Sequence, residues 1–69
     1  MKIDINAPED LKNALLKNRG AWRNFERFAN SYRNMYIGWV TGAKTEKTRM
    51  KRIAEVVNRS SLNKRPGIE

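Results

Sequence analysis

The sequence predicts a compact all-α domain of four helices with short connections. Apolar residues recur at helical spacing in four segments, and residues that start or end helices lie between these segments. Strand-like alternation is confined to Ile3 and Ile5. Because a chain of 69 residues has room for one domain at most, residues 1–69 are expected to form a single helical domain with an ordered core at about 7–60.

The first helix is expected to begin at Pro8 and to end before Gly20. A proline fits the first turn because its missing N–H would have no partner there. Glu9 and Asp10 follow, and their charges complement the positive end of the helix dipole. The apolar face of this helix is predicted to consist of Leu11, Ala14 and Leu15.

Two segments rich in aromatic residues follow, with Ser31 expected to cap the second and Gly42 to end it. Within residues 21–29 one apolar face is predicted from Trp22, Phe25, Phe28 and Ala29. Within residues 32–41 the strongest helical period of the chain joins Tyr32, Met35, Tyr36, Trp39 and Val40. All six aromatic rings are predicted to lie in the core, because so small a domain needs them inside. The alternative, a stacking platform for single-stranded nucleic acid, fits their strict helical spacing less well.

The last helix is expected over residues 45–59, with Thr45 at its start. Its buried stripe is predicted to consist of Met50, Ile53, Ala54 and Val57. Cations are predicted to project away from this stripe or to flank it: Lys44, Lys47, Arg49, Lys51, Arg52 and Arg59. Among them, Arg49 is expected to lay its stem on the core and to pair with a carboxylate or a carbonyl. From Ser60 onward the sequence predicts a frayed basic tail, and residues 61–69 are expected to be flexible.

The side chains that enzymes use most are scarce. Cysteine and histidine are absent, which removes thiolate metal sites and the commonest general base. Glu9 and Asp10 are the only carboxylates close in sequence, and neighbouring helical positions diverge by about 100°. No glycine-rich phosphate loop is present. The sequence therefore predicts no catalysis, no metal site, no cofactor and no small-molecule ligand.

Fifteen Lys and Arg against seven Asp and Glu give a net charge of +8, which attracts polyanions or simply keeps the surface solvated. No apolar run approaches the roughly 20 residues that span a bilayer, and the start of the chain lacks a secretory signal, so a cytoplasmic location is expected.

The predicted function is a non-enzymatic interaction module that binds an acidic protein surface through the basic face of the last helix. Two alternatives are non-specific nucleic-acid binding and a helper role for a neighbouring domain; Lys and Arg would hold phosphates without reading bases.

Four short motifs, taken in order, resemble a bacterial family: Pro8-Glu9-Asp10-Leu11, Phe25-x-x-Phe28-x-x-Ser31-x-Arg33, Tyr36-x-x-Trp39-Val40 and Ala43-Lys44-x-x-x-Thr48-Arg49-x-x-Arg52-Ile53. From about residue 7 to residue 67 the chain is similar to the YdeI/OmpD-associated family, also labelled bacteriocin-protection. The resemblance implies a compact helical fold and a microbial source, and it supplies no agreed reaction or ligand. The chain departs from the family at Lys47, where relatives commonly have an acid, and at Asn30, where they often have a proline.

The residues that match the most specific family motif are candidates for a binding site: Lys44, Thr48, Arg49 and Arg52. Lys51 joins them because it lies in the same basic cluster, which consists of Lys44, Lys47, Arg49, Lys51 and Arg52. A structural role is the alternative, in which Thr45 caps the last helix while Thr48 and Arg49 brace the joint after Gly42. For Thr48 and Arg49 the structural role is favoured.

Overall fold

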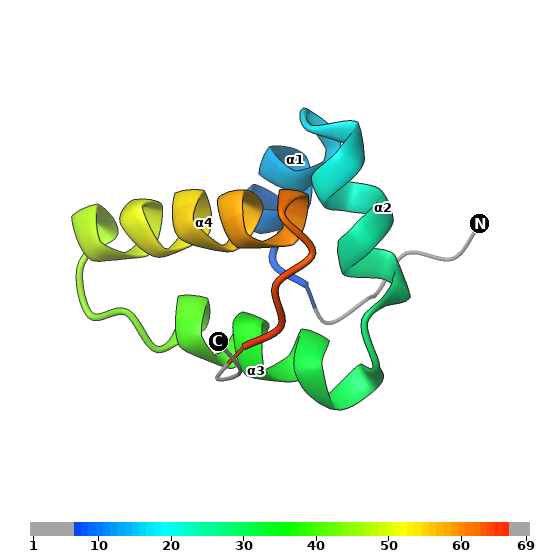
Figure 1. The fold of residues 1–69 in the computed structure, drawn as a ribbon. Helices are drawn as coiled ribbons and strands as arrows, with labels where there is room; N and C mark the ends of the chain where they lie inside the picture. Colours follow the sequence, from blue (N-terminus) through cyan, green and yellow to red (C-terminus); the bar gives the residue numbers. More distant parts are fainter. Residues whose placement is uncertain (1–6, 67–69) are drawn as a thin grey trace.

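The computed structural model describes residues 7–66, and in this range the chain forms four α-helices and no strand (Figure 1). They are α1 (Glu9–Leu16), α2 (Arg19–Arg27), α3 (Asn30–Thr41) and α4 (Glu46–Ser61). In Figure 1, α3 and α4 run in opposite directions one above the other, α2 stands steeply at the end where α4 finishes, and α1 lies behind α4. The predicted all-α class is confirmed. Ile3 and Ile5 lie outside the described residues.

Side-chain caps decide where two of the helices start. The Asn18 side chain accepts a hydrogen bond from the Ala21 amide at 3.1 Å, so α2 begins at Arg19 and Gly20 lies inside its first turn. The prediction that Gly20 ends the first helix is therefore wrong, because the capping side chain lies two residues earlier. Thr45 accepts from the Thr48 amide at 3.1 Å and starts α4 as predicted.

The start of α3 differs from the prediction. Ser31 lies inside the helix, and the capping position is Ala29, whose side chain makes no cap bond. The α2–α3 joint is instead held by Arg33, whose Nη1 donates to the carbonyl oxygens of Glu26 at 3.0 Å and Phe28 at 2.5 Å. The arginine thus satisfies backbone acceptors at the end of α2, which lack partners inside the helix.

The core lies between α1, α2, the second half of α3 and the second half of α4. It contains an aromatic trio, Phe25, Phe28 and Tyr36, with ring centroids 6.2 to 6.4 Å apart. The buried apolar residues are Leu11, Leu15, Ala21, Phe25, Phe28, Tyr36, Ile37, Val40, Ile53 and Val56. No helix of the described chain is both long and apolar enough to cross a membrane.

The aromatic residues are less deeply buried than predicted. Trp22 and Tyr32 are partly buried against the core, but Trp39 is 41% exposed and Met35 is 55% exposed. The reason is a rotation of α3, whose inward face carries Ile37 between Tyr36 and Val40. The periodic pattern of the sequence also fits an inward face centred on Met35 and Trp39. In the packed domain the face with Tyr36, Ile37 and Val40 points inward.

The buried stripe of α4 is also rotated from its predicted position. Ile53 is buried as predicted, whereas Met50 is 63% exposed and Ala54 is exposed. Val56 and Ser60 are buried instead. Met50, Ala54 and the partly buried Val57 line an open groove beside α1, which does not seal them from water.

The chain from Ser60 to Pro66 is more closely attached than the sequence indicates. Ser60 is helical and fully buried, which contradicts its assignment to a frayed tail, and its carbonyl accepts a hydrogen bond from Asn24 Nδ2 at 2.8 Å. Further along, the Lys64 carbonyl accepts from the Tyr36 hydroxyl at 2.7 Å, and the Arg65 guanidinium lies 5.6 Å from the Tyr32 ring centroid. Residues 67–69 of the expected tail lie outside the described residues.

Candidate interaction surface

All five predicted site residues lie at the α3–α4 end of the domain. Lys44 is exposed in the joint before α4, and Lys51 is exposed on α4 itself. Thr48, Arg49 and Arg52 are half-buried on the first two turns of α4. Their contacts divide these residues into a group that holds the fold together and a group that faces solvent.

Arg49 joins α4 to the start of α1 through a two-point ion pair. Its Nε lies 2.7 Å from Asp10 Oδ2 and its Nη2 lies 3.1 Å from Asp10 Oδ1. The hydrogen bond from Arg49 lowers the pKa of the Asp10 carboxyl, against a smaller opposing effect of burial. The same bond raises the pKa of Arg49. The expected pairing of Arg49 with a carboxylate is confirmed.

This ion pair predicts a pH dependence of stability. Because the folded pKa of Asp10 lies below its ordinary value of 3.8, the stabilisation is present above that value and is lost as the pH falls through the folded pKa. Asp10→Asn is therefore expected to lower the thermal midpoint slightly at neutral pH, with the difference shrinking in acid and in high salt. Thermal melts from pH 7 to about 2.5 check this.

Glu9→Gln is the matched control, because Glu9 is the neighbouring exposed acid and makes no ion pair within residues 7–66. Its melting curves should run parallel to those of the wild type across the acid range. If Asp10→Asn behaves like Glu9→Gln at every pH, the Arg49 ion pair does not contribute to folding.

Arg52 and Thr48 also hold the joint between α3 and α4. Arg52 Nη1 donates to the Trp39 carbonyl at 2.8 Å, and the guanidinium carbon lies 5.2 Å from the centroid of the Trp39 ring. This places a cation at the negative end of the α3 dipole. The Thr48 hydroxyl lies 3.0 Å from that of the capping Thr45. These contacts support the structural alternative for Thr48 and give Arg52 a structural role.

Three lysines form the solvent-facing group: Lys44, Lys47 and Lys51. All are exposed, and none of their side-chain ammonium groups makes a hydrogen bond or ion pair with another described residue. Lys47 was not among the predicted site residues, although its place one turn before Lys51 puts it on the same side of α4. We call these residues the lysine cluster.

A groove of about 720 Å³ runs between α3, α4 and Pro66. It is lined by Met35, Tyr36, Trp39, Thr48, Lys51, Arg52, Glu55, Arg59 and Pro66. Met35 and Trp39 were predicted as core and so were missed as surface, whereas Tyr36 is buried as predicted. The sequence signal that could have found them is Ile37, which offers α3 a second apolar residue to turn inward beside Tyr36 and Val40.

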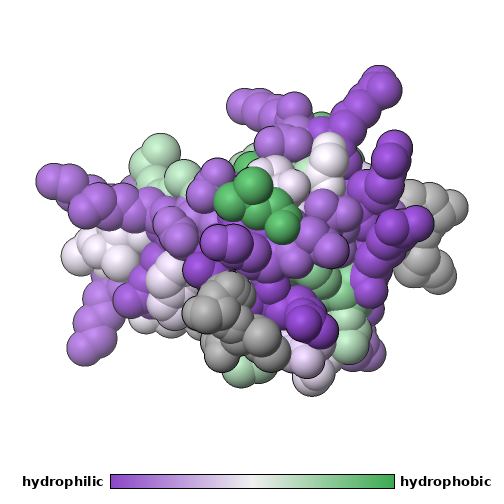
Figure 2. Space-filling view, in the orientation of Figure 1, coloured by the Kyte–Doolittle hydropathy of each residue, from purple (hydrophilic) through white to green (hydrophobic). Residues whose placement is uncertain are grey.

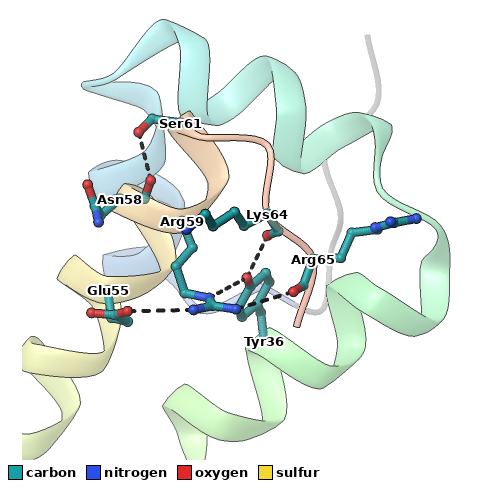
Figure 3. Close-up of polar contacts among 7 residues, drawn as sticks. All are labelled: Tyr36, Glu55, Asn58, Arg59, Ser61, Lys64 and Arg65. Carbon is teal, nitrogen blue, oxygen red and sulfur yellow. Dashed lines mark hydrogen bonds and ion pairs between the residues drawn. The ribbon is translucent and has the colours of Figure 1, made fainter. Parts of the chain in front are cut away.

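Arg59 belongs to the lining of this groove, and Figure 3 shows its polar contacts. Its Nε donates to the Tyr36 hydroxyl at 3.0 Å, and its Nη2 donates to the Arg65 carbonyl at 3.3 Å. Its Nη1 lies 3.9 Å from Glu55 Oε2, the i,i+4 ion pair on α4. The guanidinium therefore connects α3, α4 and the segment after α4, and its charge is partly balanced by Glu55.

The positive charge of the domain is not confined to α4. Arg19, Arg23 and Arg27 are exposed at successive turns of α2. In Figure 2 hydrophilic residues cover most of the visible face and project from it in several directions. The distribution of charge therefore does not distinguish a binding face from a solvated surface. The two are distinguished here by whether each cation has a partner within the fold.

The fold and this surface define a small, basic, all-α domain in which a cation-lined groove opens between two antiparallel helices. The family model described as Bacteriocin-protection, YdeI or OmpD-Associated matches residues 4–63. The chain therefore belongs to this family, and the predicted resemblance is confirmed. Neither the curated proteins nor the solved structures contain a match to the chain.

Proposed function

We propose that this domain is a non-enzymatic interaction module that binds an acidic partner protein through the basic face at the start of α4. The observation that carries the proposal is the division of the basic cluster. Arg49 and Arg52 have partners within the fold, whereas Lys44, Lys47 and Lys51 are exposed and have none among the described residues. Exposed lysines on a stable helix attract an acidic surface and speed its encounter.

The absence of a catalytic role is part of the proposal. Perturbed pKa values gather at catalytic sites, because enzymes tune their acids and bases. The pKa shifts of Asp10 and Arg49 arise from the ion pair that these two residues form between α1 and α4. That pairing accounts for both shifts without any reaction. The family name refers to bacteriocin protection and to association with OmpD, which is compatible with a binding role.

Charge reversal tests the proposal. A variant with Lys44, Lys47 and Lys51 all changed to Glu is expected to bind an acidic peptide at least about tenfold more weakly than the wild type, because attraction becomes repulsion. The matched control changes Arg19, Arg23 and Arg27 to Glu, which alters the net charge equally on exposed positions of α2. Fluorescence anisotropy of a labelled, glutamate-rich peptide measures both affinities.

The control separates location from charge. We expect the α2 variant to stay within about threefold of the wild type, because screening weakens charges more than about 10 Å away. Equal losses in the two variants, or no peptide binding by the wild type at low salt, would contradict the proposal. A random duplex titrated at two salt concentrations tests the other reading. The domain would be a non-specific nucleic-acid binder if it bound the duplex more tightly than the peptide and if the duplex affinity fell with salt in proportion to the number of phosphates contacted.

A further inference from the structure

The groove between α3 and α4 leaves large apolar side chains in water on one side. Met35 is 55% exposed and Trp39 is 41% exposed, one helical turn apart on α3. Tyr36 forms the floor beside them and is itself buried. Methionine and tryptophan are residues that interfaces use heavily, because one adapts its shape and the other buries a large area.

The opposite side of the groove carries positive charge. Lys51 and Arg52 lie on the α4 wall together with Glu55 and Arg59. Glu55 lies within ion-pair distance of Arg59, so these two charges partly cancel. Lys51 has no hydrogen-bond or ion-pair partner among the described residues. The Arg52 guanidinium has five N–H groups and uses one of them for its hydrogen bond to the Trp39 carbonyl. The wall therefore offers cations to a ligand that enters the groove.

A groove with one apolar side and one cationic side fits a segment that carries both apolar and acidic side chains. Apolar residues of the segment would contact Met35 and Trp39, while its carboxylates would pair with Lys51 and Arg52. A groove of about 720 Å³ between two helices can receive one face of a helix, with anchors spaced three or four residues apart. We infer that the α3–α4 groove docks an amphipathic acidic segment of a partner protein, an inference that rests on the proposed function.

Nucleic acid fits this groove less well than such a segment. The Arg52 guanidinium already lies over the Trp39 ring, so the ring does not present both faces to a base. The other exposed apolar residue of the lining is Met35, which has no aromatic face on which a base could stack.

Two peptides distinguish the groove from simple charge attraction. The first is an amphipathic helical peptide of about four turns in which leucines recur every three or four residues among glutamates. The second has serine in place of each leucine and the same charge. By fluorescence anisotropy, the folded domain is expected to bind the leucine peptide at least about tenfold more tightly, because only that peptide buries apolar surface against Met35 and Trp39.

Met35→Ser and Met50→Ser supply the matched variants, since both residues are exposed methionines and Met50 lies in a different groove, beside α1. Met35→Ser is expected to weaken leucine-peptide binding about tenfold and to leave serine-peptide binding unchanged, whereas Met50→Ser changes neither. Equal binding of the two peptides, or equal losses in the two variants, overturns the groove assignment while leaving the proposed function intact. Failure of both peptides to bind removes the proposed function as well.

Discussion

Val56→Asp is expected to unfold the domain. Val56 is fully buried on α4 as part of the apolar core cluster, so a carboxylate at this position would lose its contact with water. An unpaired buried charge costs about 3–5 kcal/mol, and a domain of this length has about 3–10 kcal/mol of stability in total. Far-UV circular dichroism at 25 °C should therefore show little helix, or a urea midpoint far below that of the wild type.

Ala54→Asp is the control for this variant. Ala54 lies two residues earlier on the same helix and is exposed, so the new carboxylate stays in water. The free energy of unfolding should change by less than about 1 kcal/mol. The pair tests which face of α4 points inward, because the apolar pattern of the sequence favours Ala54. A more damaging Ala54→Asp would show that α4 is turned the other way.

Phe25→Ala is expected to have the second-largest effect. Phe25 is 2% exposed, and its ring contacts both Phe28 and Tyr36 in the aromatic trio. Truncating a buried phenylalanine to alanine costs about 3–5 kcal/mol, because it removes apolar contact and leaves a cavity. In so small a domain no second core layer compensates for the loss. Urea unfolding followed by circular dichroism measures the change.

Leu16→Ala is the comparison for the core prediction. Leu16 is a large apolar residue of α1 that is exposed, so its truncation should alter the free energy of unfolding by no more than about 0.5 kcal/mol. If Phe25→Ala unfolds at nearly the same urea concentration as Leu16→Ala, the aromatic trio does not hold the domain together.

The number and order of helices could be predicted from local signals, since capping residues and apolar spacing act within a few residues. Thr45 marks the start of α4, and the acids after Pro8 mark the start of α1. Asn18 is a local signal of the same kind, because its capping side chain marks the start of α2 two residues before Gly20. The rotation of α3 and α4 about their axes could not be predicted in the same way. Met35 and Ile37 are equally plausible inward residues, and only the packed neighbours decide between them.

The candidate site could be predicted from the sequence only in part. Lys44, Thr48 and Arg49 come together because they lie within two turns of one helix start. The partner of Arg49 is Asp10, 39 residues away, and no local pattern names it. The groove forms because α3 lies beside α4. The sequence alone therefore does not predict that Met35 and Trp39 are exposed on its apolar side.

The most direct measurement of the central claim is a ¹H–¹⁵N correlation spectrum recorded during titration with the leucine-containing acidic peptide. We predict that the largest shifts occur for the Trp39 indole and for amides near Met35, Lys51 and Arg52, while the amides of Arg19, Arg23 and Arg27 stay in place. Shifts spread evenly over the α2 arginines and the lysine cluster would contradict it, because they would show that the peptide responds to net charge and not to the α3–α4 surface.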